Sequence, residues 1–407
     1  MFCPSNRLPL AAMALGLLLA LVPVPGWTGE GPKVYIVTMH PGDALFTGFG
    51  HIAFRIEDSS QGTDDVFDYG TYDAEDPLLG WKFLVGSLPY YCQHTSFDDM
   101  VAWYKNDFGG IELRELSLTP DQVAKLQARV SNDCLPENAA YAYHHFHNNC
   151  ATKIRDILDD LLGGTLAAAT KQAPAGRTLR NLIDASMARW QFAITRWAVF
   201  GLLNWEIDAP ATRWEQMFLP FYLSEELDGL SQPALPGNPP LVGERTLVVG
   251  AQHGPPSLPT STFGALFALV LLLLALAPAL LPERAARRLC GALLVGTGTI
   301  GGFYGMVLLF SWAVSPYPET AATMTLLILH PLHWFLVPAG IGVWRGRERW
   351  RRGAFRYVLA GVALSVLVIV ANLSGLVPQH IWHYGVGSCC LTSGIAVSLW
   401  RQRPRLS

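Results

Sequence analysis

The sequence predicts an α+β domain outside the cytoplasm, followed by an α-helical transmembrane bundle. Apolar residues make up 51% of the 407 residues. After about residue 262 they gather in segments long enough to cross a bilayer as helices of ~20 residues. The preceding region instead alternates short β-branched and aromatic runs with helical patterns, over a length that suits a globular domain. A formal net charge of −3 gives no reason to expect nucleic acid as a partner.

Residues 1–26 have the layout of a secretory signal or an N-terminal anchor. Arg7 precedes the apolar run "PLAAMALGLLLALVPVP" at 9–25, and a more polar stretch follows it. Because no convincing small-x-small cleavage site follows the run, the sequence leaves both removal and retention of this segment open.

Residues 27–230 are expected to form the extracytoplasmic domain. Its early part reads as strands, because short β-branched and aromatic runs are separated by Gly, Asp and Ser turns. The expected strands are "KVYIVTM" (33–39), "HIAFRI" (51–56) and "VFDYGTY" (66–72). Residues 231–260 are rich in Pro and Gly and are expected to be a linker, with one candidate strand in "ERTLVVG".

Two helices are expected in the same domain. Over 119–133, Thr119 is a helix cap and Pro120 occupies the first helical position. The segment "ATKIRDILDDLL" has apolar residues at helical spacing, and Gly163 with Gly164 ends it.

Residues 261–407 predict a bundle of about five transmembrane helices. The expected spans are 262–281, 290–312, 321–344, 356–377 and 384–400. The connections after the first and third spans and the tail after the fifth contain arginines, whereas the other two connections contain no Lys or Arg. The positive-inside rule therefore places these arginines and the C-terminus in the cytoplasm. The α+β domain then lies outside the cytoplasm, which in a Gram-negative cell is the periplasmic side of the inner membrane.

The stretch "YHHFHNNCATKIRDILDDLL" at 143–162 places a cysteine where a helix begins. Asn148 and Asn149 are good helix caps, so Cys150 falls at or near the first turn. The helix N-terminus carries partial positive charge and free N–H groups, which stabilise a thiolate and can hold the oxyanion of a tetrahedral intermediate. By itself the stretch fits a catalytic nucleophile and a structural cysteine about equally.

A cysteine nucleophile needs a histidine within hydrogen-bond reach and a third group that orients the imidazole. The local histidines share the approach to Cys150 and would have difficulty folding back onto its sulfur. His51 at the start of a strand is the better base, and Asp68 on the adjacent strand is its expected partner. A helix-borne Cys that faces a His and an acid on neighbouring strands is papain-like geometry. Because the order here is His, Asp, Cys, the expected fold is a permuted papain-like one.

A metal site in "HHFHNNC" is the alternative for the same stretch. Histidine and cysteine are suitable zinc ligands. The spacing matches no compact zinc signature, however, and His144 and His145 would point to opposite faces of an extended chain. We therefore expect no metal.

At these residues the chain resembles a known family. The segments "FGHIAFRI", "VFDYGTYD", "FLVGSLPYY", "HNNCATKIRD" and "WEQMFLPFYL" are similar to those of the Lnb-type lipoprotein N-acyltransferases, a former family of unknown function. The resemblance covers roughly residues 33–225, and the hydrophobic C-terminal part also fits. "NNCATKIRD" is its most specific block.

The resemblance implies a Cys-dependent acyltransferase without a cofactor, whose permuted papain-like fold is similar to the NlpC and LRAT (lecithin:retinol) groups. An acyl chain would move from a membrane phospholipid to Cys150 as a thioester. It would then pass to the α-amine of the diacylglyceryl-cysteine of a lipoprotein acceptor. His51 carries over as general base and later acid. The position of Asp68 is often asparagine in relatives, and either side chain can accept from an imidazole N–H.

The sequence also suggests secondary roles. Tyr69, Asn148 and Asn149 are expected in the oxyanion or substrate region from their positions. Cys92 and Cys134 are the other cysteines of the exported domain, so in an oxidising compartment we expect them to pair and leave the thiol of the helix free.

Several aromatic and polar residues are ambiguous. The tryptophans suit either a membrane interface or a core, and ionisable groups in spans suit either function or helix packing. These residues are Trp190, Trp197, Trp205, Trp214, His330, His333, Asn372, His380 and His383.

Two other functions fit the same residues. A membrane-tethered cysteine hydrolase, either a phospholipase or a cell-wall amidase or peptidase, would use water in the second step. A non-enzymatic binding module would use the cysteine and the histidine structurally. The distance between His51 and Cys150 discriminates the catalytic interpretations from the last one.

Overall fold

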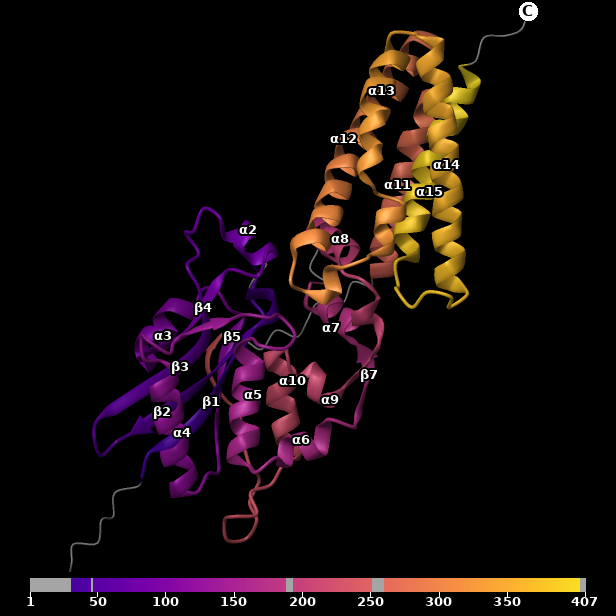
Figure 1. Ribbon diagram of the computed structural model, residues 1–407. Coiled ribbons are helices and arrows are strands. Elements are labelled where there is room, and N and C mark those ends of the chain that lie inside the picture. Colours follow the sequence, from indigo (N-terminus) through magenta and orange to yellow (C-terminus); the bar gives the residue numbers. More distant parts are fainter. Residues whose placement is uncertain (1–30, 45–46, 188–192, 251–259, 403–407) are drawn as a thin grey trace, which may run out of the picture.

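The computed structural model describes residues 31–44, 47–187, 193–250 and 260–402 (Figure 1). It consists of a mixed α/β domain that lies beside one end of a long helical bundle. The expected signal or anchor at 1–26 and Trp190 lie outside the described residues.

An antiparallel sheet of seven strands forms the centre of the α/β domain, in the order β6-β4-β3-β2-β1-β5-β9. The three strands expected from the sequence are confirmed as β1, β2 and β3. Strand β9 comes from the Pro/Gly-rich segment and pairs with β5, so this segment contributes to the domain. The strands are β1 Lys33–His40, β2 His51–Asp58, β3 Thr63–Thr71, β4 Pro89–Ser96, β5 Gly110–Glu115, β6 Ala140–Ala142 and β9 Thr246–Gly250.

Helices cover both faces of this sheet. Helices α4 (Pro120–Asp133) and α5 (Cys150–Leu161) pack on one face through a buried cluster that includes Phe54 and Ile154. Helix α3 (Phe97–Tyr104) covers the other face, where Met100 is buried against the sheet. The remaining elements are α2 Leu79–Leu84, α6 Thr165–Thr170, α7 Leu179–Ser186, α8 Ala193–Leu202, α9 Arg213–Gln216, α10 Pro220–Glu226, and a second sheet of β7 Pro174–Thr178 and β8 Pro210–Thr212.

Both helices expected in the domain are present because their first turns are capped. Thr119 and Gln122 form a capping box at α4, with Pro120 at its first position. Asn149 and Thr152 form a second one at α5. Each box satisfies two backbone N–H groups that have no partner within the helix.

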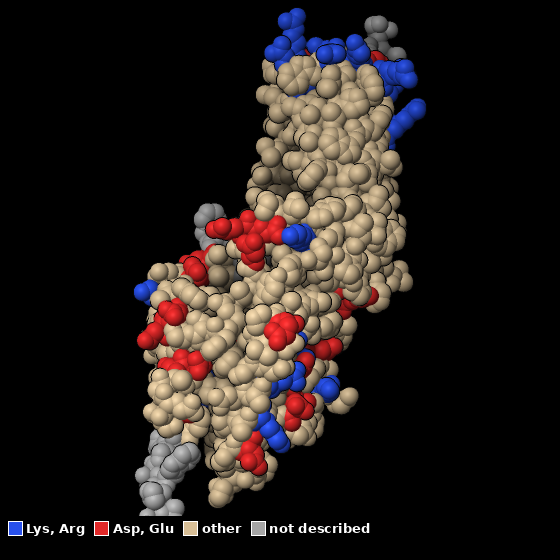
Figure 2. Space-filling model, turned by 60° about the vertical axis from the view of Figure 1, so that its left-hand side comes forward, with Lys and Arg blue, Asp and Glu red and all other residues tan. Residues whose placement is uncertain are grey.

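The bundle consists of α11 (Thr260–Leu276), α12 (Glu283–Val314), α13 (Leu336–Trp344), α14 (Glu348–Leu373) and α15 (Trp382–Arg401). By length and composition, α12 and α14 qualify as membrane spans, and the bent pair Pro318–Leu327 and Pro331–Trp344 qualifies if it is one span. Helix α11 runs into a short 3-10 turn to form a shorter apolar helix. Figure 2 shows an uncharged middle of the bundle, with Lys and Arg gathered at the end distant from the α/β domain.

The prediction that residues 321–344 form one continuous helix is wrong. This stretch consists of 3-10 turns at Met324–Leu327 and Pro331–Phe335, and only then α13. Pro331 accounts for the break, because proline lacks an N–H and clashes with the preceding helical turn. The two parts of the pair are bent by 41°.

The domain is joined to the bundle through the segment around α8. The Asn204 side chain donates to the carbonyls of Pro318 (2.9 Å) and Ala321 (2.8 Å). Trp197 stacks on Tyr384 of α15, with 4.8 Å between the ring centroids. Trp197 is thus a contact between the two parts of the chain. The other described tryptophans differ, since Trp214 packs against the core of the domain and Trp205 is exposed.

Candidate active site

Cys150 is the first residue of α5, as the sequence predicts. The cap places its backbone N–H in the first turn, where amide groups have no acceptor within the helix and the helix dipole favours negative charge. The thiol is free and partly accessible, which distinguishes it from the disulfide-bonded cysteines of the domain.

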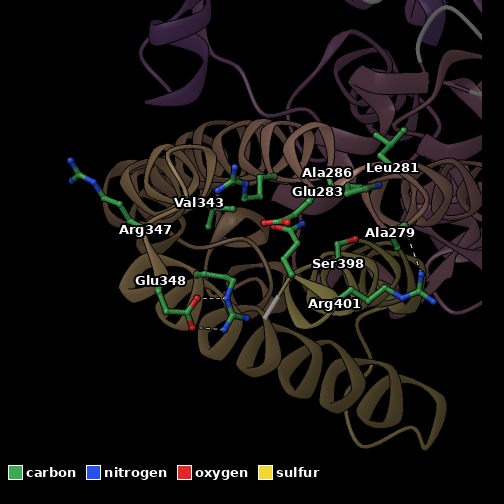
Figure 3. Close-up of a pocket in the computed structure, with 14 residues that line it drawn as sticks. Ala279, Leu281, Glu283, Ala286, Val343, Arg347, Glu348, Ser398 and Arg401 are labelled. Carbon is green, nitrogen blue, oxygen red and sulfur yellow. Dashed lines mark hydrogen bonds and ion pairs between the residues drawn. The ribbon is translucent and has the colours of Figure 1, made fainter. Parts of the chain in front are cut away.

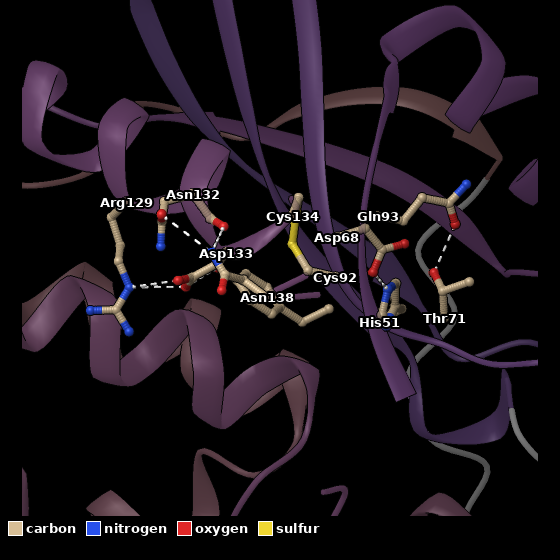
Figure 4. The surroundings of a disulfide bond; sticks show 11 residues. His51, Asp68, Thr71, Cys92, Gln93, Arg129, Asn132, Asp133, Cys134 and Asn138 are labelled. Carbon is tan, nitrogen blue, oxygen red and sulfur yellow. Dashed lines mark hydrogen bonds and ion pairs between the residues drawn. A yellow bond between two sulfur atoms is a disulfide. The ribbon is translucent and has the colours of Figure 1, made fainter. Parts of the chain in front are cut away.

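His51 is held by a buried carboxylate. Its Nε2 lies 2.5 Å from Oδ1 of Asp68, and Oδ2 of the same carboxylate accepts from the Tyr104 hydroxyl at 2.9 Å. Asp68 is almost fully buried, so these two contacts fix its orientation. Because Nε2 is used by the carboxylate, Nδ1 is the nitrogen left to face a substrate or a thiol. Figure 4 shows the His51 ring facing the Asp68 carboxylate.

The structure brings Cys150 and His51 together at Gly70. A Cβ built on Gly70 would lie 3.4 Å from Cε1 of His51 and 3.6 Å from Cβ of Cys150. The strand register explains this position, because Ala53 pairs with Asp68 and the next residues along the same face are His51 and Gly70. Gly70 has a φ of +123° beside a bulge, a conformation that favours glycine.

The electrostatics of His51 favour the protonated ring. Burial opposes a charge on the ring, but the Asp68 carboxylate and the Cys150 sulfur outweigh it through charge and hydrogen bonding. The pKa of His51 therefore lies well above its ordinary value. An imidazolium beside the sulfur stabilises the thiolate, which is the nucleophilic form of a cysteine.

Tyr141 is a site residue that the sequence interpretation missed. Its hydroxyl oxygen lies 4.0 Å from the same Gly70 Cβ position and is buried with no hydrogen-bond partner in the described part of the chain. Burial and the nearby Cys150 raise the pKa of Tyr141, so the hydroxyl keeps its proton. It is therefore a donor without an acceptor beside the thiol. Tyr141 reaches this place because it pairs with Tyr90, which joins β6 to β4 although the two strands are far apart in the sequence.

Tyr69, in contrast, is not brought to the cysteine. Side chains alternate along a strand, so Tyr69 faces away from Asp68 into the core. Its hydroxyl donates to Asp133 of α4 at 2.9 Å. The expectation that Tyr69 lies in the oxyanion region is corrected by this contact.

The two asparagines before the cysteine shape the loop. Asn149 accepts from the Thr152 N–H (2.9 Å) and donates to the carbonyls of His145 (2.8 Å) and Phe218 (2.9 Å). Asn148 donates to the carbonyl of Ala142 at 2.6 Å. Both asparagines therefore position the start of α5. The two N–H groups of the Asn149 side chain are both used in these contacts, so that amide has none left for an oxyanion.

His144 and His145 converge, which corrects the argument that they point to opposite faces. The chain turns here, and both Nε2 atoms approach Oε1 of buried Glu319, at 3.7 Å from His144 and 2.6 Å from His145. In the described part of the chain this is the group whose geometry could hold a metal ion. The Phe146 N–H, however, donates to Nδ1 of His144 at 3.3 Å, which leaves the proton of the neutral ring on Nε2. We therefore interpret the group as a polar contact between the domain and the bundle.

The disulfide between Cys92 and Cys134 is confirmed. It joins β4 to the end of α4, as Figure 4 shows. Pairing of these two residues leaves Cys150 as the free cysteine of the described domain, which is the arrangement expected for an oxidising compartment.

The polar residues of the bundle mostly make helix-packing contacts. Nδ1 of His333 lies 3.3 Å from the Tyr357 hydroxyl, and Oδ1 of Asn372 accepts from the Ile381 N–H at 2.8 Å. His330 packs on His333, whereas His380 is exposed in the irregular stretch just before α15. His383 packs against Gly264 of α11.

The fold and the site define a membrane protein whose α/β domain carries a Cys–His–Asp arrangement beside the bundle. Comparison with known families specifies the class. Residues 29–185 match the model of the Lnb N-terminal periplasmic domain, and residues 258–396 match that of the Lnb transmembrane domain. The two matches together span most of the chain, in the order of the two structural parts, and the chain belongs to the Lnb family. No curated protein and no solved structure matches it.

Proposed function

We propose that this protein is a thiol acyltransferase that moves an acyl chain from a membrane phospholipid to the N-terminal amine of a diacylated lipoprotein. The observation that carries the proposal is the meeting of Cys150 and His51 at Gly70, with Asp68 behind the ring. We also propose that the domain is a permuted papain-like fold. A helix-borne thiol facing a histidine and a carboxylate on neighbouring strands supports it.

In the first step, the Cys150 thiolate attacks the carbonyl carbon of a phospholipid acyl ester. The Tyr141 hydroxyl and the backbone N–H groups at the start of α5 donate to the resulting oxyanion. The C–O bond to the glycerol then breaks, and the His51 imidazolium gives its proton to the leaving alkoxide. The products of this half-reaction are the thioester on Cys150, a lysophospholipid and a neutral His51.

In the second step, the α-amine of the lipoprotein attacks the thioester. Neutral His51 takes a proton from the attacking nitrogen, and Asp68 stabilises the imidazolium that forms. Collapse of the second tetrahedral intermediate forms the amide and breaks the C–S bond. The Cys150–His51 pair then returns to its resting state, so the two steps balance without a cofactor.

The attachment of the domain supports a lipid substrate. The Asn204 and Trp197 contacts hold the domain against the end of the bundle, so the thiol lies on a part of the molecule fixed next to the membrane. Both a phospholipid and a lipid-anchored lipoprotein present their reacting groups at that surface. A wall amidase would need only one anchor, whereas this chain devotes residues 260–402 largely to apolar helices.

The test is mass spectrometry of the N-terminal peptide of a reporter lipoprotein, from cells that lack their own N-acyltransferase. The wild-type protein should add one acyl chain to the α-amine, and Cys150→Ala should abolish the addition. Cys389→Ala, which changes a free cysteine within the bundle, is the matched control and should retain activity. An unmodified amine with the folded wild-type protein present would refute the transferase, and release of free fatty acid would then identify a hydrolase.

A further inference from the structure

A cavity of about 600 Å³ lies at the end of the bundle that is distant from the α/β domain. The ends of the bundle helices α11 to α15 surround it, as the close-up in Figure 3 shows. Because the family domain at the other end is periplasmic, we assign this end to the cytoplasmic side of the membrane. The charged side chains of its lining are Glu283, Arg287, Arg347, Glu348, Arg351 and Arg401.

The lining carries more positive than negative charge, with four arginines and two glutamates. Arg351 pairs with Glu348, with its Nε 2.7 Å from the carboxylate, and also donates to the carbonyl of Leu399 at 2.8 Å. Arg401 donates from Nη1 to the carbonyl of Ala279 at 3.0 Å. The charges of Arg351 and Glu348 cancel each other, so the excess positive charge of the lining comes from the other arginines.

Arg287 is the most informative of these groups. Its Nε is buried and has no hydrogen-bond partner in the described residues. A Cβ on Gly346, which has a φ of +72°, would lie 2.3 Å from Nη1 of Arg287, so the guanidinium lies directly against the turn between α13 and α14. Buried donors in folded proteins nearly always have an acceptor, and an anion in the cavity that Arg287 lines would supply one to its guanidinium.

We propose that this cavity binds the phosphate of an anionic phospholipid from the cytoplasmic leaflet. Guanidinium groups suit phosphate because their donors match its oxygens, and basic pockets between transmembrane helices at the cytoplasmic surface are suited to acidic headgroups. Leu281 and Val343 also line the cavity and would give apolar contact to the first methylenes of the lipid chains. The proposal is independent of the chemistry at Cys150.

The experiment is native mass spectrometry of the detergent-solubilised full chain, titrated with lipids whose chains are ether-linked. Ether lipids carry no acyl ester, so they report binding whether or not the protein is an acyltransferase. The probes are phosphatidylglycerol, phosphatidylcholine with the same chains, and inorganic phosphate. Phosphatidylglycerol should bind at least tenfold more tightly than phosphatidylcholine, and its affinity should fall as salt is raised.

Arg287→Gln should weaken phosphatidylglycerol binding about tenfold, because a charge-assisted contact is lost. Arg349→Gln is the matched control, since Arg349 lies on α14 outside the lining of the cavity and is exposed; the lipid affinity of this variant should equal that of the wild type. If Arg287→Gln does not fold, Arg401→Gln tests the same point at an exposed position of the lining. Equal binding of both lipids, or equal effects of the cavity and control variants, would overturn the proposal. Binding of inorganic phosphate with no preference between the lipids would instead identify a soluble anion as the ligand.

Discussion

Replacing Tyr141 with phenylalanine removes one oxygen atom from the site and should change activity and stability in opposite directions. The hydroxyl is buried without a partner in the described resting protein, and such a group costs about 1–3 kcal/mol of desolvation. Its removal should therefore raise the free energy of unfolding by about 1 kcal/mol. If the same hydroxyl donates to the oxyanion, its loss should slow acylation of Cys150 by about 10²–10³-fold, or roughly 3–4 kcal/mol of barrier.

Single-turnover formation of the thioester, followed by intact-protein mass spectrometry, measures the rate, and denaturant unfolding in detergent measures the stability. Tyr69→Phe is the control, because the Tyr69 hydroxyl donates to half-buried Asp133 at the end of α4. That variant should lose about 1–2 kcal/mol of stability and keep its rate. A Tyr141→Phe rate within threefold of the wild type would refute the oxyanion role, and a loss of stability would show that the hydroxyl has a partner.

Three further predictions test the surrounding structure. The raised pKa of His51 adds stability that is complete below pH ~6.5 and is lost as the pH rises through its folded-state pKa. The free energy of unfolding, measured from pH 6 to 9, should fall in the wild type and change less with pH in Asp68→Asn. Identical pH profiles for the two proteins would contradict the role of Asp68 as the partner of His51. Changing Cys92 and Cys134 together to alanine should cost roughly 4 kcal/mol, because the bond spans a sequence separation of 42, whereas unchanged stability would mean that the thiols are not linked. Asn149→Ala should cost about 2 kcal/mol in the same assay through loss of the cap, and a loss below about 0.5 kcal/mol would show that the cap is unimportant.

Hydrogen bonds join the domain to the bundle at defined residues. Gln379, shortly before α15, donates to the carbonyl of Leu203 at 2.8 Å. Tyr317 lies in the stretch between α12 and α13, here called the outer loop, and donates to the carbonyl of Tyr143 at 3.4 Å. Tyr143 lies close before Cys150 in the chain. The outer loop of the bundle therefore supports the loop that leads into the helix of the thiol.

The sequence alone determined the features that depend on neighbouring residues. Helix α5 begins at Cys150 because Asn149 caps the next turn, and the strands that carry His51 and Asp68 follow from short β-branched runs. The split into a polar domain and an apolar bundle follows equally from composition, since burial of apolar surface in lipid or in a core depends on local hydrophobicity. Pairing of Cys92 with Cys134 followed from counting the cysteines of the exported domain.

Only the tertiary structure decided what depends on distant pairings. Tyr141, and not Tyr69, reaches the cysteine because the edge strand β6 pairs with β4, and no local pattern encodes that register. Strand β9 likewise joins the sheet from a segment that composition describes as a linker. The third span contains Pro331, but its average hydrophobicity hides the break. Local propensity fixes where an element begins, whereas long-range packing and strand pairing choose its neighbours, and the chemistry of this site depends on those neighbours.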